Sequence, residues 1–427
     1  MIFADFHIHS KYSRATSSTM DIKHLSEYGS MKGLNVIGTG DFTHPKWRSE
    51  IKRDTEYLGK GIYKSRFNNM RFVLSSEIAT IYSQGDSVRK IHHIIILPDF
   101  EIVEQFVDNL SRKLLASNKK ANFTSDGRPI IGMSSLELCD TLFSTYDKAL
   151  LIPAHIWTPW FSLFGSGSGF DKIEDCYGKY TKNIFALETG LSSDPLMNWR
   201  LSQIADKTLI SNSDCHGPFV DRIGRECNVF DTTLDAFNYD YLYDALKNKK
   251  LAFTVEVDPS YGKYHFDGHR NCNICFTPKE SIQHKNICPV CRRKLTIGVL
   301  HRVEELADKP EGYKPLNAVP FQYHVPLIEI IAALTGKGIG TKGVKEQYFE
   351  LIKKYGNEFN IMFNLSVNEI ESSFTGLGKI IQSLRDKTMK VTPGYDGVYG
   401  VPGIGTLKDK PSKTVKTPQK SILEFQK

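Results

Sequence analysis

The residues of this chain whose types and spacing could do chemistry are histidines and carboxylates that lie between His7 and His216. His7 and His9 are separated by one residue, so a strand would place both imidazoles on one face. Imidazole and carboxylate groups together favour Zn²⁺, Mn²⁺ or Fe²⁺ over Ca²⁺. The other predicted metal ligands are Asp41, Glu77, His92, His155, Asp214 and His216.

A ligand set of this size predicts a hydrolytic centre with two or more metal ions. Such ions clamp a phosphoryl group and lower the pKa of a bound water from its bulk value to about 7. Attack on a phosphodiester requires an activated water of this kind. The pattern therefore favours a metal-dependent phosphoesterase.

Several positions beside these ligands admit more than one interpretation. Asp5, two residues before the first histidine, is expected to orient a ligand imidazole rather than to bind metal. Either His92 or His93 could be the ligand, and we favour His92. Asp194 could be a ligand, a general acid for the leaving oxygen, or the cap of the helix that follows. We predict Asp194 and Asp214 as the catalytic carboxylates.

A second metal site is indicated by two Cys-x-x-Cys pairs that are twelve residues apart. Four thiolates at this spacing close a tetrahedral zinc site and leave no position for water, so the site is expected to be structural. Its predicted ligands are Cys272, Cys275, Cys288 and Cys291. The basic residues around it could be a solvated face or could contact phosphate; they are Arg270, Lys285, Arg292, Arg293 and Lys294. The other four cysteines are scattered singly, which fits a reducing cytoplasm.

The elements that must position the catalytic set alternate between short β-rich runs and helix-length segments up to about residue 255. This alternation predicts an α/β domain with a mostly parallel sheet, either open or closed into a barrel. In such barrels the residues at the C-terminal ends of the strands converge on one mouth. The expected strands are 35–38, 72–74, 92–97, 150–153, 184–187 and 208–211, with helices at 20–32 and 100–117.

The whole chain divides into four parts. Residues 1–255 are predicted to form the metal-dependent phosphoesterase barrel, and residues 260–303 the zinc-binding ribbon. Residues 316–400 have a helical pattern and are predicted to form a small DNA-binding domain. Within it, a glycine hairpin at 335–342 between two helices resembles a helix-hairpin-helix motif that binds the DNA backbone; an ordinary helical hairpin is the alternative. Residues 401–427 are predicted to be a flexible basic tail.

Aromatic and glycine-rich segments follow His155. The run 156–161 contains two tryptophans, and 165–169 alternates glycine with serine. The aromatic rings could stack on an unpaired base, and the glycines could let backbone N–H groups approach a phosphate. Core packing and loop flexibility are the alternatives.

Composition bounds the class of protein. The 427 residues are 40% hydrophobic and 24% charged, which is ordinary for a soluble globular protein. The net charge of +7 is too weak to establish a nucleic-acid partner on its own. There is no secretory signal, and the apolar runs are far shorter than a membrane span, so we expect a cytoplasmic protein with no membrane partner.

The order of the catalytic ligands resembles the PHP (polymerase and histidinol phosphatase) family. This resemblance implies a distorted seven-stranded β/α barrel that holds up to three metals. The chain departs from the family pattern in two places. The usual Thr-Asp-His motif is Thr39-Gly40-Asp41, so Asp41 would take the place of a histidine. The additional His or Asp that follows the first motif is absent from residues 11–15, which bears on the third metal.

The last residues resemble a clamp-interacting (PIP) motif with the pattern Q-x-x-I-x-x-F. Gln419, Ile422 and Phe425 match this pattern, while Gln426 replaces the final aromatic residue. A short motif behind a linker rich in Lys and Pro fits a segment that folds into the pocket of a sliding clamp. A basic tail without a partner is the alternative.

The order of barrel, cysteine ribbon, helical segment and clamp tail resembles the endonuclease Q family over essentially the whole chain. Segments 12–17 and 393–400 add to this resemblance. It implies a monomeric DNA repair nuclease that cuts on the 5′ side of a deaminated base (uracil, hypoxanthine or xanthine) or an abasic site. The products would carry 3′-hydroxyl and 5′-phosphate ends. The implied partners are damaged DNA, double- or single-stranded, and a PCNA-like sliding clamp.

The cofactors follow from the two ligand sets. Zn²⁺ is expected at the cysteine site and at the catalytic site, where Mg²⁺ or Mn²⁺ could also serve. Two other functions are alternatives to the nuclease. A small-molecule phosphatase of the PHP family would need neither ribbon nor clamp tail, and a non-catalytic clamp-bound scaffold would not need the nearly full set of metal ligands.

Overall fold

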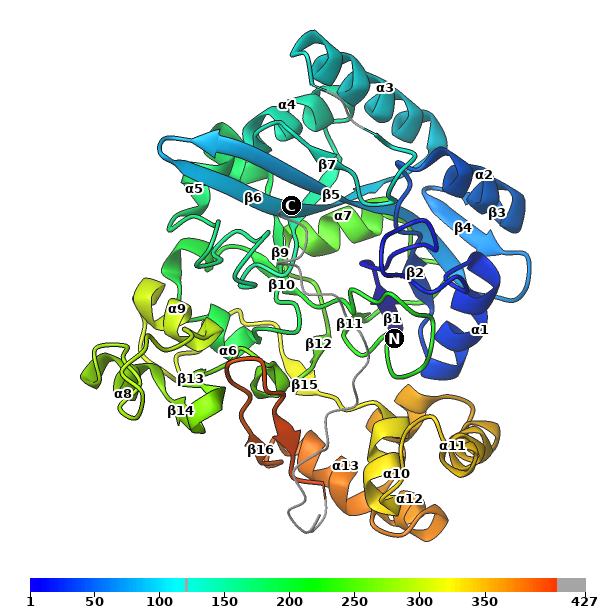
Figure 1. The fold of residues 1–427 in the computed structure, drawn as a ribbon. Coiled ribbons are helices and arrows are strands. Elements are labelled where there is room, and N and C mark those ends of the chain that lie inside the picture. Colours follow the sequence, from blue (N-terminus) through cyan, green and yellow to red (C-terminus); the bar gives the residue numbers. More distant parts are fainter. Residues whose placement is uncertain (120–121, 405–427) are drawn as a thin grey trace.

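The computed structural model describes residues 1–119 and 122–404. Its centre is a mixed sheet of eleven strands (Figure 1). These strands are β1 (Ile2–Asp5), β2 (Val36–Gly38), β3 (Thr55–Gly59), β4 (Ile62–Ser65), β5 (Arg71–Gln84), β6 (Ser87–Leu97), β7 (Ile130–Ile131), β8 (Leu150–Pro153), β11 (Cys227–Phe230), β12 (Phe253–Glu256) and β15 (Phe321–Tyr323). Their order is β15-β12-β11-β1-β2-β5-β4-β3; β6 pairs with β5 and β8, and β7 pairs with β5.

The sheet is mixed, so the prediction of a mostly parallel sheet was wrong. The pairs β1–β2 and β2–β5 are parallel, whereas β5–β6 and β6–β8 are antiparallel. The reason is a long hairpin of β5 and β6, which turns at Gly85 with a φ of 59°, a conformation that favours glycine. The expected runs 72–74 and 92–97 lie within these two longer strands.

Two further strands, β9 (Ala186–Glu188) and β10 (Thr208–Ile210), form a separate parallel pair. The backbone links this pair to strands on both sides. Ile156 N, just after β8, donates to Glu188 O at 3.1 Å. An isolated parallel bridge joins Ile8, just after β1, to Cys215, which follows β10. The C-terminal ends of β1, β8, β9 and β10 therefore lie next to one another.

The strands near the centre of the sheet are buried on both faces, which explains their nearly continuous apolar runs. On β6, Ile95 belongs to one hydrophobic cluster, while Ile94 and Ile96 belong to another. Successive side chains of a strand point to opposite faces. The neighbouring His92 and His93 are therefore directed to different sides of the sheet.

Helices flank the strands, and local sequence sets where they begin and end. Asp21 caps the first helix by accepting a hydrogen bond from His24 N at 2.9 Å, and Gly33 ends it with a φ of 103°. Ser134 and Glu137 form a capping box at the start of another helix. The helices of this part are α1 (Ile22–Lys32), α2 (Pro45–Asp54), α3 (Phe100–Ala116), α4 (Ser135–Thr145), α5 (Ile173–Tyr177), α6 (Pro195–Asn198) and α7 (Tyr239–Lys247).

The cysteine-containing region is a small unit to one side of the sheet (Figure 1). It consists of the antiparallel hairpin of β13 (Asp267–His269) and β14 (Ile274–Phe276), followed by α8 (Pro278–Gln283) and α9 (Val299–Leu306). The basic residues predicted around the ribbon are exposed: Arg270, Lys285, Arg292, Arg293 and Lys294.

The C-terminal helices form a second unit with its own hydrophobic cluster. They are α10 (Leu327–Thr335), α11 (Lys342–Tyr355), α12 (Val367–Ser373) and α13 (Leu377–Arg385), and the short strands β16 (Val391–Thr392) and β17 (Val401–Pro402) pair after them. The predicted helix, glycine hairpin and helix correspond to α10 and α11. Strand β15, inside the expected 316–400 domain, instead pairs with β12 of the main sheet. No helix within the described ranges is long and apolar enough to cross a membrane.

Candidate metal centre

Six of the predicted ligands form two groups. Four of them follow the C-terminal ends of β1, β8 and β10, whereas the other two lie inside the long strands β5 and β6 and not at strand ends as expected. The first group is His7, His9 and Asp214, and the second is Glu77, His92 and His155. Within each group, one possible ligand atom of each residue lies within 4.8 Å of the others. Because these residues come from five separate strands or strand ends, only the fold could bring them together.

Glu77 lies between the two groups. Its Oε1 is 2.5 Å from His92 Nδ1 and 3.3 Å from His155 Nε2. The same oxygen is 3.6 Å from His7 Nε2, and Oε2 is 3.6 Å from His9 Nε2. The two groups are therefore parts of one site.

An unpaired buried atom of the site fits a metal. His7 Nε2 is buried and has no hydrogen-bond partner, although Glu77 Oε1 and Asp214 Oδ1 each lie 3.6 Å from it. A buried polar atom without a partner costs free energy. Imidazole nitrogens and carboxylate oxygens converge here on common space, as the ligands of Zn²⁺ or Mn²⁺ do.

The charges of the site favour the metal-binding forms of its carboxylates. Burial favours the neutral form of Glu77, but the facing His92 and other histidines hold the pKa of Glu77 well below its usual range. Burial also opposes ionisation of Asp214, and His7 nevertheless holds the pKa of Asp214 well below its usual range. Burial lowers the pKa of His92 to about 4. Despite burial, the facing carboxylates raise the pKa values of His7, His9 and His155, so metal binding would displace protons from these three imidazoles.

Sequence reasoning missed Glu188, which orients His7. Glu188 Oε1 is 3.0 Å from His7 Nδ1, so the Nε2 of His7 faces the site. Glu188 also accepts hydrogen bonds from His155 N at 2.7 Å and Asn212 Nδ2 at 2.9 Å. A carboxylate on the far nitrogen of a ligand imidazole fixes its tautomer and its orientation. The position of Glu188 at the end of a strand, like the ligands, was the signal that could have identified it.

Asp41 reaches the site but lies in neither group. Its Oδ1 is 3.3 Å from His9 Nδ1. Its Oδ2 accepts hydrogen bonds from Ser10 N at 2.7 Å, Ser10 Oγ at 2.6 Å and Ser13 Oγ at 2.8 Å. Asp41 thus occupies the position relative to His9 that Glu188 occupies relative to His7. Its role as a metal ligand stays a prediction.

Asp5 contacts backbone rather than an imidazole. It accepts hydrogen bonds from Ser213 N and Gly224 N, both at 3.1 Å. Burial raises the pKa of Asp5 to about 6. Asp5 therefore holds the loop that carries Asp214, and the orienting role expected for Asp5 belongs to Glu188 in the structure.

Two other predicted site residues lie outside both groups. His216 Nδ1 is 3.0 Å from Asp214 O, and its ring centroid is 4.5 Å from that of His9. Asp194 caps α6 by accepting a hydrogen bond from Met197 N at 2.9 Å, and its other oxygen accepts one from Tyr323 OH at 2.6 Å. The structure thus contains the capping alternative for Asp194. Its catalytic role, and the ligand role of His216, stay predictions.

Backbone strain marks the same site. Asp41, His155 and Asp214 have positive φ angles of 48°, 31° and 47°. Residues with side chains adopt this region at a cost of about 1–3 kcal/mol each, and such residues concentrate at functional sites. All three lie in the loops that follow β2, β8 and β10.

Contacts of His93 and of the two tryptophans bear on two alternatives: which of His92 and His93 is the ligand, and whether the tryptophans pack in the core or could stack on a base. His93 Nδ1 lies 3.4 Å from Ile78 O, on the other side of the strand from the two groups. Trp157 is buried and donates to Asn198 Oδ1 at 2.8 Å, which is core packing. Trp160 is 56% exposed. Among the tryptophans of this segment, only Trp160 could contact a ligand.

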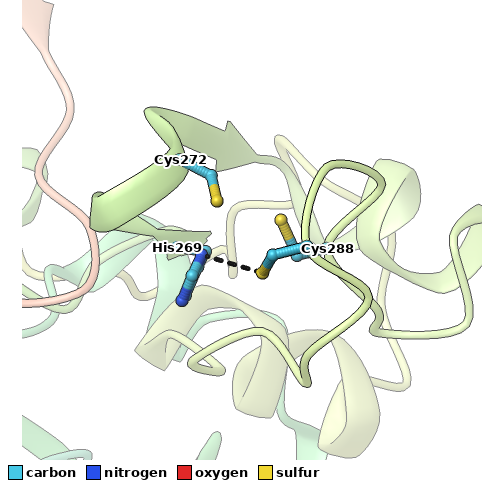
Figure 2. A group of neighbouring side chains, drawn as sticks. His269, Cys272 and Cys288 are labelled. Carbon is cyan, nitrogen blue, oxygen red and sulfur yellow. Dashed lines mark hydrogen bonds between the residues drawn. The ribbon is translucent and has the colours of Figure 1, made fainter.

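At the second site, three of the four predicted cysteines form a group with a histidine that was not predicted from the sequence, and the ligand role of Cys275 stays a prediction. Cys272, Cys288 and Cys291 converge with His269, one ligand atom of each lying within 4.8 Å of the others (Figure 2). The His269 Nδ1 is 3.5 Å from Cys291 Sγ. Cys275 lies on β14, where it pairs with Gly268, and is not among the four residues of this group. Three thiolates and one imidazole also form a closed zinc site.

The predicted clamp-binding residues Gln419, Ile422 and Phe425 lie outside the described residues.

Comparisons with known proteins place the chain in a family. A family model described as the MJ0043 C-terminal domain matches residues 326–388. The crystal structure of the lesion-specific endonuclease PfuEndoQ from Pyrococcus furiosus superposes with a TM-score of 0.83 at 30% identity, covering 96% of this chain and 97% of that one. The chain belongs to the endonuclease Q family.

Two other relatives extend this result. A structure of endonuclease Q in complex with a 27-mer duplex that carries an abasic lesion at the active site has a TM-score of 0.80 at 31% identity, over 96% of this chain and 99% of that chain. An uncharacterized protein from Methanocaldococcus jannaschii, MJ0043, is 34% identical over 57% of this chain. The matched part covers 31% of the length of that relative.

Proposed function

We propose that this chain is a metal-dependent DNA repair endonuclease. It hydrolyses the phosphodiester 5′ to a deaminated base (uracil, hypoxanthine or xanthine) or an abasic site and leaves 3′-hydroxyl and 5′-phosphate ends. The observation that carries this proposal is the pair of His and carboxylate groups around Glu77, in a chain of the endonuclease Q family.

The proposed chemistry needs metals at both groups. When bound, Zn²⁺, Mn²⁺ or Mg²⁺ would polarise the phosphoryl group and activate a water. The protein itself holds the ligands in place: Glu188 fixes His7, and Asp41 fixes His9. Asp214, a third exposed, is the ligand nearest to solvent in the first group and thus to an incoming phosphate.

The scaffold of this site is proposed to be the distorted seven-stranded barrel of the PHP family. The candidate strands are β1, β2, β5, β6, β8, β9 and β10. Their pairings, the Ile156–Glu188 backbone hydrogen bond and the Ile8–Cys215 bridge support a closed order. Residues 1–255 would then be the catalytic unit.

Lesion specificity would come from the cost of turning a base out of the duplex. A deaminated base is mispaired, so its extrusion costs less than that of a paired base. The family relative bound to a duplex with an abasic lesion at its active site supports a substrate of this kind. The ring centroid of Phe161 is 4.7 Å from that of His92, and the preceding residue, Trp160, is exposed. Trp160 would stack on the unpaired base.

The remaining parts are proposed to serve DNA and clamp binding. The zinc unit (260–303) presents exposed lysines and arginines that can contact phosphate. The helical unit (316–400) presents the open hairpin between α10 and α11, where a Cβ on Gly338 or Gly340 would meet nothing within 4 Å. The tail (401–427) would bind a PCNA-like clamp through Gln419, Ile422 and Phe425.

The proposal is tested by assaying duplexes that contain uracil, an abasic site or no lesion, before and after removal of metal with a chelator. We expect cleavage 5′ to the lesion that disappears with the metal and returns with Zn²⁺, Mn²⁺ or Mg²⁺. Cleavage that persists without metal would contradict the proposal. Hydrolysis of small phosphomonoesters with no cleavage of DNA would favour the phosphatase alternative instead.

A further inference from the structure

The loop formed by residues 126–129, just before β7, closes one side of the metal centre. Gly127 N donates to Tyr12 O at 3.0 Å, and Thr43 Oγ1 donates to Gly127 O at 3.2 Å. A Cβ on Gly127 would lie 2.2 Å from Asp41 Oδ2, so the loop backbone packs directly against the site. Ala79 N donates to Pro129 O at 2.9 Å and fixes the other side of the loop.

This loop brings one arginine to the metal centre. Arg128 Nη1 is 3.4 Å from Glu77 Oε2. The side chain of Arg128 is 25% exposed, while that of Glu77 is fully buried. Among the ion pairs of the described residues, Arg128 is the only lysine or arginine paired with a carboxylate of the two groups. The arginine therefore lies between the buried ligands and solvent.

The contact with Glu77 leaves most of this guanidinium unused. A guanidinium carries five N–H donors in a planar fork that matches the oxygens of a phosphate. The single long contact to Glu77 occupies one of them. A fixed cation at the open side of the site can pair with the negative charge of an incoming phosphodiester.

We propose that Arg128 is a catalytic residue that binds a non-bridging oxygen of the scissile phosphate and stabilises the charge that develops there. This inference rests on the proposed nuclease function. A purely structural role, in which Arg128 only neutralises Glu77, is the reading to be excluded.

The first part of the test compares Arg128→Gln and Arg128→Lys with Arg53→Gln, a matched control at an exposed arginine that pairs with Asp54. Single-turnover cleavage of a uracil duplex should fall about 10²- to 10³-fold in Arg128→Gln, as for removal of one donor to a developing oxyanion. Arg128→Lys should recover part of the rate because it keeps a point charge. Arg53→Gln should cut at the parental rate, and all variants should keep the parental metal content and melting temperature.

The second part places sulfur at each non-bridging position of the scissile phosphate. If Arg128 binds one of these oxygens, the parent cuts one sulfur diastereomer more slowly than the unmodified duplex. The ratio of these two cleavage rates should be smaller by about threefold or more in Arg128→Gln. If Arg128→Gln binds less metal than the parent, Arg128→Lys, which keeps the positive charge, is used for the same measurement.

Three outcomes would overturn the inference. Parental cleavage by Arg128→Gln would show that no contact is needed. Slow cleavage with sulfur effects equal to those of the parent at both diastereomers would show a structural role. A parent that cuts no lesion duplex at all would overturn the proposed function itself, and the inference with it.

Discussion

The metal centre and the cluster around Glu358 are both buried sets of charged side chains, but they differ in how their polar atoms are paired. Lys32 Nζ, on α1, donates to Glu358 Oε1 at 2.7 Å, and Tyr348 OH donates to Glu358 Oε2 at 3.0 Å. His324 Nε2 lies 3.0 Å from Glu358 Oε1, and Leu327 N donates to the same oxygen at 2.9 Å. Both oxygens of the carboxylate are satisfied within the protein.

The metal centre lacks this closure. His7 Nε2 is equally buried and has no hydrogen-bond partner, and Glu77 Oε1 faces three imidazoles instead of a set of fixed donors. A closed set such as that of Glu358 stabilises contacts between α1 and the C-terminal helices, because removal of any member leaves a buried group unpaired. An open set of ligand atoms requires something from outside the chain. The metal centre thus differs from the Glu358 cluster in the convergence of several imidazole and carboxylate ligand atoms on common space.

The largest effect is expected from the open set. Asp214→Ala should reduce cleavage of a lesion duplex by at least about 10³-fold, because it removes a ligand of the first group. Binding to the same duplex, measured by gel shift, should persist, since the exposed lysines and arginines lie elsewhere. Asp235→Ala, at a carboxylate whose side chain is 96% exposed, is the matched control. Retained cleavage by Asp214→Ala would show that the group is not catalytic.

Substitutions in the closed set around Glu358 should lower the stability of the fold and leave cleavage intact. Lys32→Met leaves Glu358 buried without its cation and should lower the free energy of unfolding by about 3–5 kcal/mol. Denaturant unfolding measures this change, with the exposed Lys23→Met on the same helix as the control. Below the unfolding range, the variant should still cut lesion DNA. A change of less than about 1 kcal/mol would mean that the pair is replaceable by apolar packing.

A smaller effect on activity is expected from Glu188, a fully hydrogen-bonded carboxylate that contacts a ligand of the metal centre. Glu188 is satisfied like Glu358 but serves the open set through His7. Glu188→Gln removes its charge and should lower metal affinity or cleavage by about 10- to 100-fold without loss of the fold. The exposed Glu174→Gln is the control. Metal titration followed by cleavage separates the two effects, and parental behaviour in both would exclude the orienting role.

The smallest effect is a difference in acid stability. Burial alone would raise the pKa of Glu358, but Lys32 and then His324 lower it to about 2, from an ordinary value of 4.5. Because the folded pKa is depressed, this stabilisation is present above the ordinary value and is lost as pH falls from 4.5 toward about 2. The free energy of unfolding of Lys32→Met should therefore depend less on pH in this window than that of the parent. Equal slopes in the two proteins would contradict this assignment.

Sequence patterns pointed to six residues that the structure brings together in the two groups, because the signals for these residues are local. His7 and His9 are recognised by their one-residue spacing, and Glu77, His155 and Asp214 by the apolar strand that precedes each. The structure brings all of these together, along with His92.

Residues that act through a partner could not be predicted in the same way. Glu188 contacts His7 across 181 residues of sequence, and no short motif contains both. His269 precedes the first Cys-x-x-Cys pair and faces the site only because of how β13 and β14 pair. The long hairpin of β5 and β6 was hidden for a related reason: only parts of the two strands are apolar enough to be recognised as strands.

The most direct test of the central claim is anomalous scattering from crystals of the protein grown with Mn²⁺. The account predicts ions within bonding distance of Glu77, with His7 Nε2 and His92 or His155 among their other ligands, and no ion at Glu358. An ion-free site at Glu77 in crystals whose dissolved protein still cuts lesion DNA with Mn²⁺ would contradict it.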